Sequence, residues 1–528
     1  MDNNLKSALD IQKNLQKFLY IRGYLITDYK NIIKNEYPFY NNWNEIEIGN
    51  YYGYIHKQQQ YYKIHNKNFI LLLVGHAYNP FDMNYSEDII LKKLINKLDN
   101  SYDEFIDYFN ELTGIFTLFI FNNDGAISVF TDCSGMQACY YGNVKENVYI
   151  SSHTQLIGDL CSLHFDNYIE ELINYKHFGL YGMYLPGDLS PFKNIKRIVP
   201  NTCIKYSNNS FSIERFYPNK KIDYVSPNEY DNVIKEISKL MSNNMELISQ
   251  KWDKPAISLT GGTDSKTTLA CAAKNYDKFS YFSYISMPGE KIDADAAHKI
   301  CDTLNLQHKI YEVSTNKDKY NDFELVKKIL RNNLGNIGDS NENDICKRIF
   351  FSEREDFDVE VKSWVSEIAR ANYYKKFGKK RFPKDVKPRF LTAMYKIFLK
   401  NNKLLKATDK VFEEYLEKTK FVENLYNYDW TDLFLWEIRY GSWGGLVITS
   451  EHKYSFDITI PYNNRKIMDL FLSLPLEKRI EDTPHMDIIK TMNDDINKTG
   501  IHIVNYNETK TRMYVEKMYY YFTTKLRP

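Results

Sequence analysis

A glycine turn between an apolar run and a helix-like run is the feature that most constrains this chain. The segment reads ISLTGGTDSKTTLA, from Ile257 to Ala270. The run AISLT predicts a strand, Gly261 to Ser265 a loop, and KTTLACAAKNY a helix. A second strand (FSYFSYISM) and a second helix (DADAAHKICDTLN) follow. This order of elements predicts a doubly wound parallel sheet.

The turn suits a phosphate group. Its backbone N–H groups and the positive end of the following helix dipole favour phosphate oxygens. Thr260, Thr263 and Ser265 add hydroxyl donors, and two glycines let the backbone approach a ligand closely. Asp264 could hold Mg²⁺ against the phosphates. We therefore expect a bound pyrophosphate, although a turn of this composition alone can also be an ordinary turn. The spacing differs from that of Walker and dinucleotide-binding loops.

The composition indicates a globular chain with two or more domains. The 528 residues are 43% hydrophobic and 15% aromatic, which excludes a disordered chain. The formal net charge of +1 gives no electrostatic case for nucleic acid as a partner.

The cysteines and the N-terminus favour a cytoplasmic protein. Seven cysteines lie far apart without a CxxC pair, so the sequence indicates neither a disulfide framework nor a zinc site. The N-terminus lacks the pattern of a signal peptide, and the longest apolar run, FILLLVG (69–75), is too short to span a bilayer. We expect neither secretion nor a membrane-spanning segment.

The first 218 residues predict a sheet-rich domain. The sequence GIFTLFIFNNDGAISVF predicts two strands around an Asn-Asn-Asp-Gly turn. Residues 146–152, 201–207 and 210–216 predict further strands because they are rich in β-branched and aromatic residues.

A helix is expected after Ser226, where Ser226 and Glu229 have the spacing of a capping box and Pro227 takes the first helical position.

Landmarks in this half resemble, in order, the glutaminase domain of the B-type asparagine synthetases. VGHAYN (74–79) is similar to the family's Gly-Glu-x-Tyr-Asn stretch, and LTGIFTLFIFNNDG to its Gly-x-Phe-Ala strand pair. TDCSGMQACYYG and FKNIKRIVPNTCI resemble two later segments of that domain. Each match is weak alone, and their order carries the resemblance.

One departure bears on glutamine hydrolysis. The family's glutaminase uses a Cys freed as residue 1, with its α-amino group as base. This chain begins Met1-Asp2 and has no Cys before Cys133. We therefore expect a glutaminase-like domain without its activity, retained as a structural support or docking surface.

The second half resembles the synthetase domain of the same family. The turn is similar to the Ser-Gly-Gly-x-Asp-Ser signature of the PP-loop ATP pyrophosphatases, with Thr260 in the first position. DADAAHKICDTLNLQHKIYEV and VKSWVSEIARANYY (361–374) match two further segments, the latter without the family's glycines. FDITIPYNNRKIMDLFLSLP (456–475) matches another closely. The implied fold class is α/β and α+β, with an Ntn-type glutaminase-like sheet domain over residues 1–218 and a doubly wound parallel-sheet PP-loop synthetase domain over residues 219–528.

The resemblance also implies site residues. Lys510 matches the family's late lysine, which stabilises charge on the acyl-adenylate, and Lys490 is the competing candidate. Glu437 and Tyr440 fall near the acceptor pocket of relatives and are predicted as catalytic, although core packing explains the tryptophans beside them equally well. Glu367 joins Asp264 as a predicted metal ligand. The predicted ATP- and pyrophosphate-binding residues are Ser258, Thr260, Gly261, Gly262, Thr263, Asp264, Ser265 and Met287.

The implied function is an ATP- and Mg²⁺-dependent ligase that adenylates a substrate carboxylate and transfers the acyl group to an amine. This pattern resembles the β-lactam synthetase, carbapenam synthetase and lasso-peptide cyclase branch. The expected partners are small-molecule or peptide carboxylates and amines, without nucleic acid or membrane, and a homodimer or a biosynthetic partner protein is left open. The alternatives are an ammonia-dependent asparagine synthetase-like enzyme, a PP-loop aminating or sulfur-transfer enzyme, and an inactive scaffold.

Overall fold

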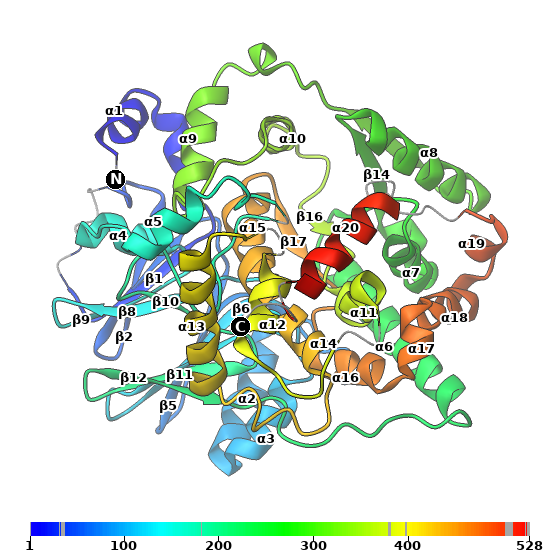
Figure 1. The fold of residues 1–528 in the computed structure, drawn as a ribbon. Coiled ribbons are helices and arrows are strands. Elements are labelled where there is room, and N and C mark those ends of the chain that lie inside the picture. Colours follow the sequence, from blue (N-terminus) through cyan, green and yellow to red (C-terminus); the bar gives the residue numbers. More distant parts are fainter. Residues whose placement is uncertain are drawn as a thin grey trace.

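The strands in the described part of the chain form two antiparallel sheets and one parallel sheet (Figure 1). The computed structural model describes residues 2–30, 32, 37–180, 182–378, 382–396, 399–501, 510–522 and 524, without the side chains of residues 510 and 512. The last antiparallel strand ends at Arg215, and the first parallel strand begins at Pro255. The predicted α/β and α+β architecture is therefore confirmed, and the predicted domain boundary at residue 218 falls in the segment between the two kinds of sheet.

Each antiparallel sheet has six strands. The first has the order β10-β8-β9-β1-β3-β2 and the second the order β12-β11-β7-β6-β5-β4. The strands of the first sheet are β1 (Tyr24–Thr27), β2 (Trp43–Ile48), β3 (Tyr51–His56), β8 (Tyr140–Val144), β9 (Asn147–Ser151) and β10 (Lys196–Arg197). Those of the second are β4 (Tyr61–His65), β5 (Phe69–Tyr78), β6 (Thr113–Asn122), β7 (Ile127–Thr131), β11 (Thr202–Ser207) and β12 (Ser210–Arg215).

Alternation along β5 explains how the two sheets stack. Leu72 and Val74 belong to a core that lies between the sheets, whereas Leu71 and Leu73 belong to the larger core on the opposite face. Successive strand residues point to opposite faces, so a strand buried on both sides reads as a continuous apolar run. The predicted hairpin is confirmed, because β6 pairs with β7 across the turn at residues 122–126.

The parallel sheet has five strands in the order β15-β14-β13-β16-β17. Its strands are β13 (Pro255–Ser258), β14 (Ser280–Ile285), β15 (His308–Glu312), β16 (Val359–Val361) and β17 (Asp457–Thr459). From the central strand β13 the chain adds β14 and β15 on one side, and later β16 and β17 on the other. The strand order therefore reverses between β13 and β16, which is the position where open α/β sheets usually bind ligands.

Helices cover both parts. Those among the antiparallel strands are α1 (Asn3–Ile11), α2 (Glu87–Asn100), α3 (Tyr102–Phe109), α4 (Thr154–Cys161) and α5 (Asn167–Ile173). Those of the second half are α6 (Tyr230–Lys251), α7 (Thr263–Cys271), α8 (Pro288–Thr303), α9 (Phe323–Asn333), α10 (Glu342–Ser352), α11 (Asn372–Phe377), α12 (Pro388–Tyr395), α13 (Asn402–Lys418), α14 (Trp430–Phe434), the π-helix η6 (Leu435–Gly444), α15 (Gly445–Ser450), α16 (Arg465–Ser473), α17 (Leu476–Ile480), α18 (Thr483–Asn493), α19 (Asp495–Lys498) and α20 (Lys510–Tyr521). None of the helices in the described ranges is long and apolar enough to cross a bilayer.

Helix α6 begins later than the sequence predicts. Its first residue is Tyr230, not Pro227. Glu229 does accept hydrogen bonds from the backbone and the hydroxyl group of Ser226, but the backbone N–H of Glu229 bonds to the carbonyl of Ser226, which makes a turn ahead of the helix.

The two halves share one core and several buried polar contacts. The larger hydrophobic core is a single cluster of contacting side chains that includes residues of both halves, the first being Leu5 and the last Tyr520. Asn463 donates to the Asp132 carboxylate at 2.8 Å, and Arg465 donates to the Asp132 carbonyl at 3.1 Å. The Tyr78 and Thr459 hydroxyl groups lie 2.9 Å apart. These contacts fix the antiparallel part against the parallel sheet.

Candidate active site

The predicted glycine turn lies at the C-terminal end of β13, beside the point where the strand order reverses. Residues 259–262 connect β13 to α7, and Gly262 caps the helix. Ser258 is the last residue of the strand, and its hydroxyl lies 3.4 Å from the Val361 carbonyl of β16. The predicted order of strand, loop and helix is thus confirmed, but α7 begins at Thr263, so Thr263 to Ser265 form its first turn and not part of the loop. The turn faces the segment that follows β16.

Internal hydrogen bonds shape the loop. The backbone N–H of Thr260 donates to the Ser265 hydroxyl at 3.0 Å, and that of Gly262 donates to the Thr260 hydroxyl at 3.2 Å. The backbone N–H of Gly261 donates to the Asp293 carboxylate of α8 at 3.3 Å. Burial raises the pKa of Asp293. One of the loop amides thus already donates to a carboxylate oxygen.

The first turn of α7 retains donors for a ligand. Among the described residues, none accepts a hydrogen bond from the backbone N–H groups of Thr263, Asp264 or Ser265. These groups stand at the positive end of the helix dipole. Because the loop hydroxyls lie beside them, the arrangement can bind phosphate oxygens.

Asp264 belongs to a cluster of charged side chains from three elements. Arg370, in the segment after β16, donates to Asp264 Oδ2 at 2.6 Å. The same guanidinium donates twice to Asp482, at 2.7 and 2.8 Å, and Lys375 also donates to Asp482. Burial opposes ionisation of Asp482, but the hydrogen bonds from Arg370 and Lys375 lower its pKa to about 2. The cluster ties α7, the segment after β16 and the start of α18 together at the switch point.

Glu367 and Tyr440 meet beside this cluster. The Tyr440 hydroxyl donates to Glu367. Burial, and then the nearby Asp264 carboxylate, raise the pKa of Glu367. The structure therefore brings three predicted site residues together, with Glu367 and Asp264 close enough to interact electrostatically.

His485 on α18 completes the buried face of this site. Its Nε2 lies 3.8 Å from Asp264 Oδ1, and its side chain is only 1% exposed. Burial lowers the pKa of His485 to about 4. The described residues contain no group of three or more His, Cys, Asp and Glu side chains arranged to hold a metal ion.

Glu437 lies outside the site, in a structural network of its own. Arg215 donates to both carboxylate oxygens of Glu437, at 2.6 and 2.9 Å, and Tyr415 donates at 2.6 Å. The Glu437 side chain is fully buried. Because these bonds engage both of its oxygens, the geometry suits a structural role, and the site described above does not use Glu437.

The remaining predicted residues lie around the loop or beyond the described side chains. Met287 is 42% exposed and precedes α8, at the C-terminal end of β14. Lys510 begins α20, but its side chain lies outside those described. Helix α20 packs on α11, where Lys376 pairs with Glu516 at 3.0 Å. The competing Lys490 is exposed on α18.

The cysteines do not suit a nucleophile of the glutaminase kind. All seven are free, and six are buried. Burial raises the thiol pKa of every one, to about 12 for Cys133, Cys139, Cys203, Cys271 and Cys301. A reactive cysteine needs an accessible thiolate of lowered pKa.

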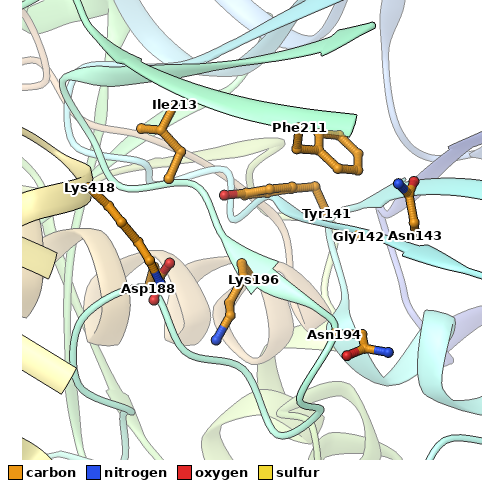
Figure 2. A pocket seen from close by; sticks show the side chains of 9 residues that line it. All are labelled: Tyr141, Gly142, Asn143, Asp188, Asn194, Lys196, Phe211, Ile213 and Lys418. Atoms are coloured by element: carbon orange, nitrogen blue, oxygen red, sulfur yellow. The ribbon is translucent and has the colours of Figure 1, made fainter. Parts of the chain in front are cut away.

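A separate surface cavity of about 400 Å³ lies in the antiparallel half (Figure 2). Tyr141 and Phe211 form its aromatic wall, with ring centroids 4.8 Å apart, and Asp188, Lys196 and Lys418 also line it. These residues come from β8, β12, β10, α13 and the segment before β10. The cavity is therefore distinct from the loop at β13.

No family model and no curated protein matches the sequence. Solved structures that show limited similarity to this chain include the following three. Glutamine phosphoribosylpyrophosphate amidotransferase from B. subtilis, complexed with ADP and GMP, is 10% identical over 57% of this chain and 61% of its own, with a TM-score of 0.22. A structure titled as the allosteric regulatory enzyme of purine biosynthesis is 10% identical over 56% of this chain and 61% of its own, with a TM-score of 0.23. Glutamine-dependent NAD+ synthetase from Acinetobacter baumannii, in complex with ADP, is 12% identical over 42% of this chain and 41% of its own, with a TM-score of 0.21.

The chain thus spans about three fifths of the length of the first two structures and about two fifths of the third. At these TM-scores the similarities carry no argument about function.

Proposed function

We propose that this chain is an ATP-dependent carbon–nitrogen ligase that forms an acyl-adenylate and passes the acyl group to an amine without hydrolysing glutamine. The observation that carries the proposal is the loop after β13. It combines first-turn amides, three hydroxyl-bearing residues and Asp264 at the point where the strand order reverses. Such a site favours a pyrophosphate group. The asparagine synthetase-like family, in its branch without glutaminase, fits this reading best.

The proposed reaction has two steps. The substrate carboxylate attacks the α-phosphorus of ATP, an O–P bond forms, and pyrophosphate leaves toward the first turn of α7. The amine then attacks the acyl carbon, a C–N bond forms, and AMP leaves with the former carboxylate oxygen. Adenylation is needed because a carboxylate is a poor electrophile.

Separate groups of residues would bind the pyrophosphate and the metal ion. Backbone amides of the α7 first turn and the hydroxyls of Thr260, Thr263 and Ser265 would bind the departing pyrophosphate. Mg²⁺, held by Asp264, would neutralise phosphate charge when it is bound. The unpartnered Oδ1 of Asp264 fits such an ion.

Tyr440 and Glu367 would accept the proton that the amine loses. Burial, and then the Glu367 carboxylate, raise the pKa of Tyr440 well above its usual value, so its hydroxyl stays protonated and cannot act as a base alone. A hydroxyl that donates to a carboxylate can instead pass a proton along, from the amine to Tyr440 and from Tyr440 to Glu367. Lys510 remains the proposed cation for the acyl-phosphate group.

The raised thiol pKa values favour an amine donor other than glutamine. With no accessible thiolate among the cysteines, the antiparallel half would serve as support for the synthetase part. We further propose that the amine belongs to a substrate and that the reaction serves natural-product or peptide modification.

Nucleotide binding tests the site directly. Titration calorimetry with α,β-methylene-ATP and Mg²⁺ should show one site per chain, and Asp264→Asn should weaken the affinity at least about 10-fold, because the carboxylate charge is lost. Asp107→Asn is the matched control, since Asp107 is 66% exposed on α3. A wild-type chain that does not bind the nucleotide would contradict the proposal.

A further inference from the structure

Two buried polar atoms face one another in the site without a hydrogen-bond partner. Among the described residues, neither Asp264 Oδ1 nor His485 Nε2 has a partner, and the two atoms are 3.8 Å apart. This distance is too long for a direct hydrogen bond. A buried polar atom left unpaired is costly, so such a pair indicates a missing bridging group.

Packing fixes both atoms in place. Asp264 stands in the first turn of α7, and Arg370 holds its other oxygen, Oδ2. His485 stands on α18, where its ring stacks on Phe471 with centroids 5.2 Å apart and an interplanar angle of 20°. Helices α7 and α18 pack against one another (Figure 1). The gap is therefore a fixed feature of two helices, not an accident of two mobile side chains.

The charges around the gap allow a cation. The cluster contains two aspartates, Asp264 and Asp482, and two cations, Arg370 and Lys375. Glu367 adds a third carboxyl group. The cluster therefore has no excess of positive charge to repel a metal ion. A carboxylate oxygen and an imidazole nitrogen on opposite sides of a gap of this width can both reach one divalent ion.

We propose that His485 Nε2 is a second protein ligand, beside Asp264 Oδ1, for the divalent cation that accompanies the nucleotide, and that it makes the site select Mn²⁺ over Mg²⁺. This inference rests on the proposed function, because phosphate oxygens of the nucleotide complete the coordination shell. Imidazole is a ligand of transition metals, whereas Mg²⁺ prefers oxygen. Among the transition metals, Mn²⁺ also accepts the carboxylate and phosphate oxygens present here.

A manganese titration tests the proposal without any turnover. With α,β-methylene-ATP present, the electron paramagnetic resonance signal of free Mn²⁺ should fall as one ion binds per chain. His485→Gln should weaken Mn²⁺ binding at least about 10-fold, the loss expected for a metal-site ligand or its support, and should change Mg²⁺ binding by less than about 3-fold. His298→Gln, on the exposed face of α8, is the matched control. Unchanged Mn²⁺ affinity in His485→Gln would overturn the proposal and leave a water molecule in the gap.

A second measurement needs no variant. Electron spin-echo modulation of the wild-type Mn²⁺ complex should show the coupling of a directly bound ¹⁴N nucleus. A complex without this coupling would also overturn the proposal. If Mg²⁺ and the nucleotide bind but either manganese test fails, only the role of His485 is contradicted. If the nucleotide does not bind at all, the proposed function is contradicted as well.

Discussion

Gly262 has φ −72° and ψ 157°, a backbone conformation that any L-residue can adopt. Backbone strain therefore does not require glycine at this position. A Cβ atom built there would meet the Thr260 hydroxyl at 3.3 Å, which is a tight but adjustable contact. A glycine here fits the proposed close approach of a phosphate ligand to the loop backbone.

Replacement of Gly262 by alanine tests phosphate binding at this loop. We expect the variant to fold with an unchanged melting temperature, since its backbone is compatible with alanine, and to bind α,β-methylene-ATP at least about 10-fold more weakly. Gly289→Ala is the matched control, because Gly289 lies on α8 and a Cβ there meets no atom within 4 Å. Titration calorimetry measures both variants. Equal nucleotide affinity in Gly262→Ala and the wild type would argue against phosphate binding at this loop.

The sequence predicts part of this site but not its charged partners. Residues 260–265 are contiguous, so the sequence alone identifies the glycines and hydroxyls of the loop and of the first helical turn. Arg370 and His485 reach Asp264, and Asp482 reaches Arg370, only because the segment after β16 and helix α18 fold against α7. Arg370 lies three residues after Glu367, which the sequence does identify as a candidate metal ligand. This nearness in the chain was the one sequence signal that could have identified Arg370 as a residue of the site.

At the scale of elements, the π-helix η6 directs its polar residues to different parts of the molecule. Glu437 binds Arg215 of β12, whereas Tyr440, on the same helix, binds Glu367 after β16. The sequence groups these two residues because they are neighbours in a tryptophan-rich segment. Their partners come from opposite halves of the chain, which local spacing cannot reveal.

Replacement of Glu437 tests its structural assignment. Glu437→Gln leaves the Arg215 guanidinium buried without a balancing charge, and we expect the free energy of unfolding to fall by about 3–5 kcal/mol. Glu414→Gln is the control, since Glu414 is 47% exposed on α13 and its pair with Lys418 contributes little. Chemical denaturation followed by circular dichroism gives both values. A Glu437→Gln variant as stable as the wild type, yet unable to turn over, would restore a catalytic role.

At the scale of the whole molecule, buried histidines link stability to pH. His56 and His153 lie in the antiparallel half, and His452 and His485 lie in the second half, all 7% exposed or less. Burial lowers the pKa of His56 and His485 to about 4 and that of His153 to about 3. An unfolded histidine binds a proton near pH 6.5, whereas these folded ones stay neutral until much lower pH.

The sign of the effect follows from proton uptake. Between about pH 6.5 and 4 the unfolded chain binds more protons, so each such histidine lowers the stability as the pH falls, by about 2 kcal/mol at pH 5. Asp432 acts in the opposite direction, because burial raises its pKa to about 7. His153→Gln isolates one contribution, and the stability difference between pH 7.5 and pH 5 should shrink by about 2 kcal/mol in this variant. An identical difference in the variant and the wild type, measured by urea denaturation, would contradict a neutral buried His153.

The order of sheets could be predicted because strand-rich composition in the first half is followed by alternating strands and helices in the second. The hairpin turn at residues 122–126 fixes β6 and β7 as neighbours, whereas the pairing of β5 with β6 spans two helices and has no local signal. The start of α6 was wrong by three residues, since the side chain of Glu229 caps a turn ahead of the helix. The buried contacts between the halves, such as Asn463 with Asp132, depend on topology and have no signature in the sequence.

The central claim is that the loop after β13 supports formation of an acyl-adenylate. ATP–pyrophosphate exchange, measured with Mg²⁺ or Mn²⁺ over pooled carboxylates, tests it most directly. We expect exchange that requires one class of carboxylate and that falls at least about 100-fold in Asp264→Asn but not in Asp107→Asn. Exchange that persists in Asp264→Asn, or a wild-type chain that binds ATP yet catalyses no exchange with any carboxylate pool, would contradict the claim.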